Sequence, residues 1–215
     1  MYAREIYQVA KNGGVEPTGN PSLKRILEKA KKEQVPADII KRAIDKVNSG
    51  ADETYETVKY ELFGPNGSTL IVECLTDNVN RSVSSVRAVI NKCKSKMGSM
   101  GSVSFNYDNL CIIGFKGLTE EETLELLIEN GIDVEDIEED DLVIVYGAPQ
   151  DSFAIKEAIQ NKIRDVNFEI DEISMLPKEK VTLEGEDLEI FNRLLTMLDD
   201  VEDVNKVYHN VELDA

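Results

Sequence analysis

Apolar positions recur every three or four residues along the first fifty residues, which is the spacing of amphipathic helices. Residues 2–12 form the first such segment. Asn20-Pro21 is a start signal for a second helix, because proline suits the first helical turn. A third segment ends at Gly50. The pattern therefore predicts a small helical domain over residues 1–50.

Beyond residue 50 the period changes to the two-residue alternation that is typical of half-buried strands. Residues 55–63 and 68–76 both alternate, and the Gly-Pro-Asn-Gly sequence at 64–67 predicts the turn of a β-hairpin between them. The elements predicted next are a helix over 80–96, a loop over 97–102 and a strand over 103–107.

The following segments predict the order strand, helix, strand, strand, helix, strand over 110–116, 119–130, 132–137, 141–147, 150–163 and 167–175. This βαββαβ order is that of a ferredoxin-like unit. A strand over 180–183, a helix over 186–198 and a strand over 206–213 remain, and they are too few to be stable alone. We therefore predict an α+β fold of three domains: the N-terminal helical domain 1–50, an α/β domain of 51–109 and 178–215, and a ferredoxin-like α/β domain of 110–177 inserted in it.

The composition restricts the class of protein. Of the 215 residues, 41% are hydrophobic and 31% are charged, which is typical of a globular protein. No run of 18 apolar residues occurs and the N-terminus lacks a secretory signal, so we expect a cytoplasmic protein that does not enter a membrane. The three cysteines have no C-x-x-C spacing, and His209 is the single histidine. We therefore expect buried free thiols, no metal and no cofactor.

No catalytic motif has the structural context that its chemistry needs. Segment 64–67 leads into a strand, whereas a phosphate-binding loop leads into a helix. Ser99 and Ser102 follow a helix and precede a strand, so the strand-to-helix turn of a nucleophile elbow is absent. The acidic runs at 120–122 and 138–141 fit a helix start and a hairpin turn. We predict that the protein is not an enzyme and takes no small-molecule substrate.

The net charge of −18 is unevenly distributed along the chain. Residues 1–50 carry ten Lys or Arg against six Asp or Glu, whereas residues 111–215 carry eight against 29. This asymmetry favours phosphate contact at the basic end, although a Lys-rich helix face is commonly just solvated surface. With no recognition helix and no aromatic pair on neighbouring strands, we expect phosphate contact without base reading. The predicted nucleic-acid-binding residues are Lys24, Arg25, Lys29, Lys31, Lys32, Lys41, Arg42, Lys46, Arg81 and Arg87.

Several segments resemble the YebC/PmpR family, and the resemblance covers essentially the whole chain. The segments are Asn20-Pro21, Gln34-Val35-Pro36, Tyr60–Gly67, Ile71–Arg81, Met100–Val103, Val181–Gly185 and Val207–Asn210. Their order and spacing match the family, and the chain is most similar to its shorter, YeeN-like branch. The resemblance implies three domains with the third inserted in the second, which agrees with the periodicity.

The resemblance also implies a role in gene expression. Bacterial members are generally described as DNA-binding transcriptional regulators. Mitochondrial relatives are translational activators for a cytochrome c oxidase subunit, and bacterial relatives have been linked to translation on the ribosome. We predict a DNA-binding transcriptional regulator, with a ribosome-associated translation factor that contacts ribosomal RNA as the alternative.

The alternative gives a function to the segment Met97-Gly98-Ser99-Met100-Gly101, whose methionines and glycines suit an adaptable loop that contacts a partner. An ordinary helix-to-strand turn explains the same residues. A third hypothesis, small-effector binding by the ferredoxin-like unit, rests on analogy of fold alone. Family members usually begin with an additional segment rich in Lys and Arg, whereas this sequence starts at Met1, so we expect weaker nucleic-acid binding without that arm.

Overall fold

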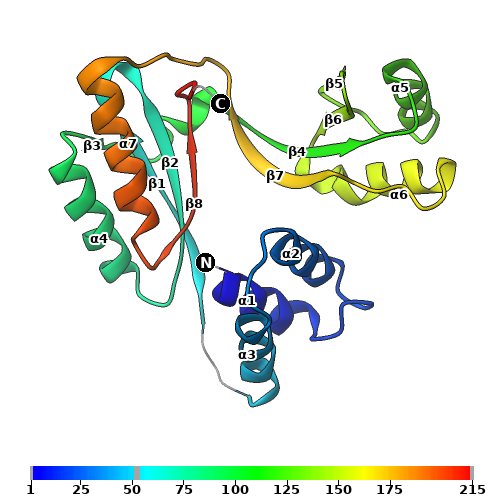
Figure 1. The fold of residues 1–215 in the computed structure, drawn as a ribbon, viewed down its shortest axis with the longest axis horizontal. Helices are drawn as coiled ribbons and strands as arrows, with labels where there is room; N and C mark the ends of the chain where they lie inside the picture. The colour runs from blue at the N-terminus through cyan, green and yellow to red at the C-terminus, as the bar shows by residue number, and fades with distance from the viewer. Residues whose placement is uncertain (1, 51–53, 214–215) are drawn as a thin grey trace. The chain divides into compact units, whose positions relative to one another are not determined.

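The computed structural model describes residues 2–50 and 54–213, which form an α+β fold (Figure 1). The helices are α1 (Tyr2–Gly13), α2 (Pro21–Lys32), α3 (Ala37–Asn48), α4 (Val79–Lys92), α5 (Glu120–Glu129), α6 (Ser152–Lys162) and α7 (Gly185–Asp199). The strands are β1 (Glu56–Phe63), β2 (Thr69–Thr76), β3 (Lys96–Met97), β4 (Tyr107–Phe115), β5 (Asp136–Glu139), β6 (Val143–Gly147), β7 (Ile170–Pro177) and β8 (Val204–His209). The chain divides into two compact units. The first runs to Phe105 and resumes at Lys180, and the second is Asn106–Glu179.

The three N-terminal helices form as their sequence predicts, and Asn20 joins the first two. Its Oδ1 accepts a hydrogen bond from the Leu23 N–H at 3.1 Å and so caps α2. Its Nδ2 donates to the carbonyls of Val9 at 3.0 Å and Gly14 at 2.8 Å, which fixes the end of α1 against the start of α2. The buried side chains between the three helices include those of Ile6, Tyr7, Leu23, Ile26 and Ala43.

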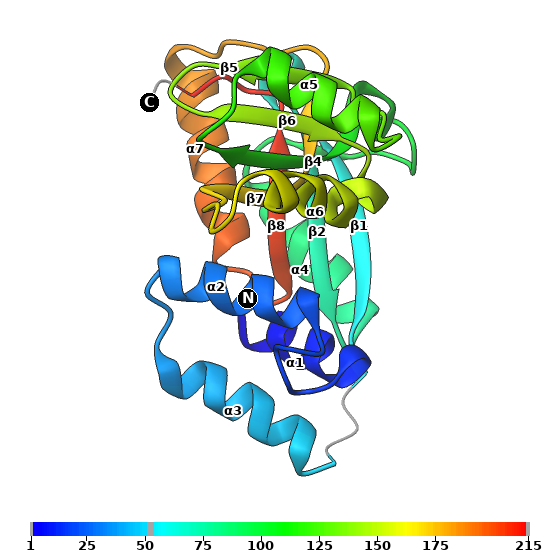
Figure 2. The same ribbon diagram turned by 90° about the vertical axis from the view of Figure 1, so that its right-hand side faces the viewer.

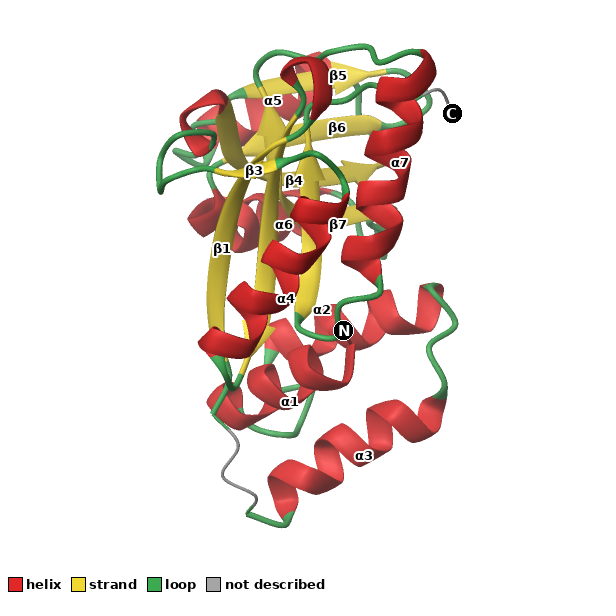
Figure 3. Cartoon of the chain, turned by 90° about the vertical axis from the view of Figure 1, so that its left-hand side faces the viewer, coloured by secondary structure: helices red, strands yellow, loops and turns green. Residues whose placement is uncertain are grey.

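The first sheet has the strand order β3-β1-β2-β8, and all of its pairs are antiparallel. The hairpin predicted between β1 and β2 is present. Helices α4 and α7 cover one face of this sheet (Figure 3). Alternate residues of β1 and β2, such as Leu62 and Leu70, point to these helices and meet Phe191 and Leu194 of α7 in a buried core.

The second unit has the strand order β5-β6-β4-β7 with all neighbours antiparallel, which is the arrangement of a ferredoxin-like βαββαβ unit (Figure 2). The predicted order of its elements is confirmed. Helices α5 and α6 bury Leu127 and Ile159 against Ile113, Phe115 and Val145 of the sheet. Helix α5 begins with a capping box in which Thr119 and Glu122 each bond to the other's backbone N–H.

Some predicted elements differ from the structure for local reasons. Helix α4 ends at Lys92 and not near residue 96, because Lys94 has a left-handed φ of 50° that no helix continues through. The predicted strand over 103–107 is absent. Ser104–Asn106 form a 3-10 turn instead, since the backbone N–H groups of Val103 and Ser104 bond to a side-chain carboxylate and not to a strand.

The strand predicted over 180–183 is reduced to a single parallel bridge between Val181 and Val211. The division into three domains stays a prediction. In the structure the N-terminal helices belong to the same compact unit as the first sheet.

The two units have separate apolar cores, and a large-to-small substitution in one is expected to leave the other intact. Phe115 and Phe191 are both fully buried, in the second and first unit respectively. Phe115→Ala is expected to lower the free energy of unfolding of the second unit by about 3–5 kcal/mol, because it leaves a cavity. Hydrogen exchange resolved by peptide measures this as lost amide protection in β4 and β6, with β2 and α4 unchanged.

Phe191→Ala is the matched control, and it should give the opposite pattern of protection. Loss of protection in both units from either substitution would contradict the independence of the two cores.

Candidate nucleic-acid interface

The basic side chains predicted on α2 and α3 fall into two groups. Three of them make ion pairs within their own helix: Lys24 with Glu28 and Lys29 with Glu33, both at 4.0 Å, and Arg42 with Asp38 at 2.9 Å. All three pairs have the i,i+4 spacing and are largely exposed, and such pairs contribute only about 0.3–0.5 kcal/mol. A phosphate can therefore replace each carboxylate partner at little energetic cost.

The other basic side chains of α2 and α3 differ in the interactions that they make within the chain. Lys46 lies over a tyrosine ring, with its ammonium 5.9 Å from the ring centroid, and Lys32 also takes part in an interaction within the chain. Arg25, Lys31 and Lys41 make no ion pair in the part of the chain that the structure describes. Lys31 and Lys41 are exposed and Arg25 is half-buried. We call these three side chains the uncommitted cations, because they are the most available of the N-terminal basic residues to an external anion.

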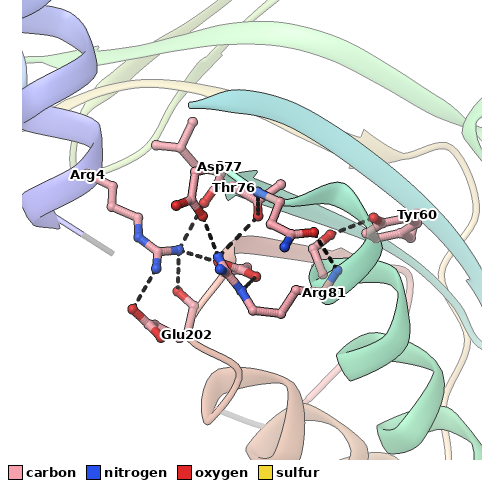
Figure 4. A network of polar contacts seen from close by, with 10 residues as sticks. Arg4, Tyr60, Thr76, Asp77, Arg81 and Glu202 are labelled. Carbon is pink, nitrogen blue, oxygen red and sulfur yellow. Dashed lines mark hydrogen bonds and ion pairs between the residues drawn. The ribbon is translucent and has the colours of Figure 1, made fainter. Parts of the chain in front are cut away.

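Arg81, in contrast, is bound by carboxylates of its own chain (Figure 4). Its Nε and Nη2 donate to the two oxygens of Asp203 at 2.9 and 2.7 Å, which is the bidentate geometry of a strong arginine–carboxylate pair. Nη2 also donates to Asp77 at 2.6 Å. The structure thus places Arg81 in an internal ion-pair network, apart from the uncommitted cations of the N-terminal helices.

Arg4 of α1 completes this network. Its Nη1 donates to Asp203 at 2.5 Å and to the Leu75 carbonyl at 3.1 Å, while Nη2 donates to Glu202 at 2.6 Å. Asp203 is 2% exposed, and burial alone would raise its pKa, but the hydrogen bonds from Arg81 and Arg4 outweigh burial and lower the pKa. Sequence reasoning missed Arg4 and Asp203, since neither lies in a motif and 199 positions separate them.

Arg87 belongs to a second, separate group of residues around an open pocket of about 730 Å³. The pocket is lined by Arg87, Ile90 and Asn91 of α4, by Ser95, and by Lys96, Met97, Gly98 and Ser99. Arg87 and Lys96 are exposed, and neither has an ion-pair partner among the residues that the structure describes. The pocket therefore carries two uncompensated positive charges.

The predicted partner loop borders this pocket, but its first residue is not loop. Met97 pairs with Leu62 in the first sheet and packs against the core beneath α4. The loop proper begins at Gly98, and a side chain there would place its Cβ 2.3 Å from the Ser102 Oγ, so any larger residue requires its neighbours to shift. Met100 is 97% exposed at the loop's outer side.

Glu61 of β1 holds this loop in shape. One carboxylate oxygen accepts hydrogen bonds from the N–H groups of Val103 at 2.5 Å and Ser104 at 3.0 Å, and the other from the Gly101 N–H at 2.7 Å and the Ser104 hydroxyl at 3.0 Å. Burial would raise the pKa of Glu61, but these hydrogen bonds outweigh it and lower the pKa. The sequence offers no signal for this role, because Glu61 has the spacing of an ordinary strand residue.

The cysteines and the histidine are the remaining reactive side chains that the sequence singled out. Cys74, Cys93 and Cys111 are buried free thiols whose pKa values burial raises. Burial lowers the pKa of His209, whose ring packs edge-on against Phe191. Over residues 2–50 and 54–213, no three His, Cys, Asp or Glu side chains are grouped to hold a metal ion, and no helix is long and apolar enough to cross a membrane.

Replacing Asp203 by asparagine is expected to destabilise the first unit. The substitution removes the charge that Arg4 and Arg81 share, and breaking a buried pair from one side costs about 3 kcal/mol. Chemical denaturation at neutral pH measures the change. Asp77→Asn is the matched control, because its carboxylate is half-exposed and its ion pair is with Arg81, and its effect should be much smaller.

The pH dependence provides an independent check of the same network. The pKa of Asp203 is lower in the folded protein than its ordinary value of about 3.9, so its stabilisation is complete above that value and is lost as the pH falls through the folded pKa. Below about pH 4 the stability of the wild type should therefore fall more steeply than that of Asp203→Asn. Equal slopes would show that Asp203 carries no special stabilisation.

Comparison with known proteins identifies close relatives along the full chain. A protein of Shewanella oneidensis named "Probable transcriptional regulatory protein" is 43% identical over 213 residues, which are 99% of this chain and 89% of that protein. A protein of the same name from Chromohalobacter salexigens is 45% identical with the same coverage. The crystal structure of a conserved hypothetical protein from Aquifex aeolicus matches with a TM-score of 0.75 and 33% identity, over 100% of this chain and 88% of that one.

Family models divide the chain in a corresponding way. Residues 1–50 match the TACO1/YebC protein N-terminal domain, and residues 55–211 match the TACO1/YebC second and third domain. The resemblance noted in the sequence is confirmed, and the chain belongs to the TACO1/YebC family.

Proposed function

We propose that this protein is a non-catalytic regulator of gene expression that binds nucleic acid through phosphate contacts, with duplex DNA as its target. The observation that carries this proposal is the set of uncommitted cations on α2 and α3, namely Arg25, Lys31 and Lys41, in a chain whose net charge is −18. The names of the relatives as transcriptional regulatory proteins support the same role.

The electrostatics of the chain favour binding in one orientation. Positive charge is in excess only among residues 1–50, and the long acidic segment beyond residue 110 repels a phosphate backbone. The weak pairs of Lys24, Lys29 and Arg42 can be exchanged for phosphates, so they add to the charge available on binding. Counterion release from the nucleic acid then provides the driving force.

Binding of this kind positions a protein on the duplex with little reading of the bases. Lys and Arg side chains on two short helices neutralise phosphates, which carry no sequence information. We therefore expect salt-sensitive and weakly selective binding, with target choice depending on further contacts.

Removing the uncommitted cations is expected to weaken DNA binding and reduce its dependence on salt. In the triple variant Arg25→Gln, Lys31→Gln, Lys41→Gln, loss of three phosphate contacts should reduce the slope of log K against log salt concentration by about 2 to 3. Fluorescence anisotropy with a labelled duplex over a series of salt concentrations measures both quantities.

The matched control removes the same charge from the second unit, in the triple variant Lys116→Gln, Lys162→Gln, Arg164→Gln. All three side chains are exposed. The proposal requires that this control keep the wild-type slope. An equal loss in both variants would mean that only net charge matters, and no specific face would remain.

Ribosomal RNA is the second candidate target, and one observation favours it. Met100 is 97% exposed on a loop whose backbone Glu61 holds through hydrogen bonds to residues 101–104, so a large apolar side chain extends into solvent from a fixed backbone. Exposed apolar side chains on fixed loops suit insertion into a structured partner. A folded RNA offers such a surface, and a uniform duplex does not.

Under this candidate function the protein sediments with ribosomes at physiological salt, and replacing Met100 by serine reduces the bound fraction severalfold. The exposed side chain has no packing role, so thermal stability should not change. Sucrose-gradient fractions probed for the protein measure the bound fraction, and Leu124→Ser, at an exposed apolar residue of α5, is the control. Complete absence of the protein from ribosomal fractions would leave duplex DNA as the target.

A further inference from the structure

The open pocket beside α4 has a composition that suits one class of ligand. Its polar side chains are Arg87, Asn91, Ser95, Lys96 and Ser99, and Ile90 and Met97 add apolar atoms. Its volume of about 730 Å³ is within the range of small-ligand sites, roughly 300–1,000 Å³. Cations, neutral hydrogen-bonding groups and apolar atoms together match the phosphate, the base edge and the base face of a nucleotide.

The two cations of this pocket are available to a ligand. Arg87 and Lys96 are exposed, and within the described residues neither makes an ion pair. The neighbouring Lys94 is different, since it pairs with Glu186 at 3.1 Å on the other side of the helix end. Among the residues that the structure describes, the lining of the pocket includes no carboxylate, which disfavours a metal cation and favours an anion.

Backbone hydrogen bonds offset part of the negative charge at the C-terminal end of α4. The Ile90 carbonyl accepts hydrogen bonds from the N–H groups of both Cys93 at 3.1 Å and Ser95 at 3.0 Å. These bonds satisfy an acceptor that otherwise adds partial negative charge at a helix C-terminus. They also turn the chain directly from α4 into β3, so that Arg87 of α4 and Lys96 of β3 line the same pocket.

The far wall of the pocket is rigid before any ligand binds. The Gly98 N–H donates to the Glu61 carbonyl at 2.7 Å, and the Glu61 carboxylate binds the N–H groups of three further loop residues. The Phe63 ring lies against Gly98, where an added Cβ would be 2.8 Å from it. A wall fixed in this way reduces the entropy lost when a ligand binds.

From this arrangement we propose that the pocket between α4, β3 and the loop from Gly98 binds one unpaired nucleotide of a single-stranded nucleic acid, with Arg87 and Lys96 on its phosphates. This inference rests on the proposed nucleic-acid binding. It adds a second binding site, separate from the cations of α2 and α3, that accepts a single strand and not a duplex. The guanidinium of Arg87 is suited to both phosphate contact and stacking on a base. A paired base in a duplex presents no free face, so the pocket selects unpaired nucleotides.

The double variant Arg87→Gln, Lys96→Gln tests the proposal in the full-length chain. The probes are a fluorescein-labelled single-stranded RNA of about 12 nucleotides, DNA of the same sequence, and the matching duplex. Anisotropy titrations at about 0.15 M salt, where the Debye length is about 8 Å, should show a loss of single-strand affinity of at least about tenfold, as expected for the loss of two phosphate contacts and a stacked base. Duplex affinity should change by less than about threefold, since its cations lie on α2 and α3.

Lys92→Gln, Lys94→Gln is the matched control. It removes the same charge from the same helix end, from residues that border a different hollow beside α7. Single-strand affinity in this control should stay within about threefold of the wild type, because long-range charge effects are screened. If RNA binds more strongly than DNA of the same sequence, the nucleotide in the pocket belongs to an RNA strand. If the two bind equally, the pocket accepts unpaired nucleotides of either strand.

The outcomes separate this inference from the proposed function. Equal losses in the two double variants, with nucleic-acid binding by the wild type intact, would overturn the nucleotide site and leave the proposed function standing. Absence of binding to every strand would overturn both. If a labelled oligo-glutamate peptide binds and loses affinity in Arg87→Gln, Lys96→Gln as strongly as RNA does, the pocket is an acidic-peptide site and the proposal is wrong.

Discussion

The buried carboxylate of Asp203 is the interaction on which the assembly of the first unit depends. It lies just before β8 and receives guanidinium groups from Arg4 of α1 and Arg81 of α4, so it ties the N-terminal helices and a sheet-covering helix to one point. A charge with 2% exposure is stable only when it is fully paired, and two arginines meet that need. The same ion pair gives Arg81 a structural role, although its position in the sequence suits a surface cation.

Glu61 organises the structure in a related way, with backbone N–H groups in the place of arginines. The strand that carries it fixes its position, and three N–H groups and a hydroxyl from residues 101–104 converge on it. Loops of this shape commonly enclose an external anion, and here the anion is part of the chain. The consequence is a loop that needs no ligand to hold its form, with Met100 outside and a pocket wall behind it.

These two carboxylates explain how a chain with 42 acidic residues keeps cations free for a partner. Most acidic residues lie beyond residue 110, away from the basic helices in sequence. Among the described residues, the buried carboxylate of Asp203 pairs with Arg4 and Arg81, and that of Glu61 binds backbone N–H groups and so pairs with no cation. Within the described residues, two groups of cations without an ion pair bear on binding: those on α2 and α3, and those that line the pocket beside α4. A long phosphate backbone suits the first set, and a single unpaired nucleotide suits the second.

The sequence by itself determined the helices, the main strands of both sheets and the βαββαβ order, because periodicity and turn residues depend on neighbours in the sequence. The order and spacing of its motifs also determined the family. The sequence also predicted a basic surface on the N-terminal helices and a role for Arg87, and these stay predictions. Tertiary structure alone decided that Arg81 is paired, that residues 103–106 turn instead of extending, and that Lys96 lines the same pocket as Arg87. Each of these depends on a partner from about ten to more than a hundred positions away, as Asp203 is from Arg81 and Glu61 from Val103. Local pattern carries no information about such partners, since a buried carboxylate and an exposed one occupy the same positions in an alternating strand.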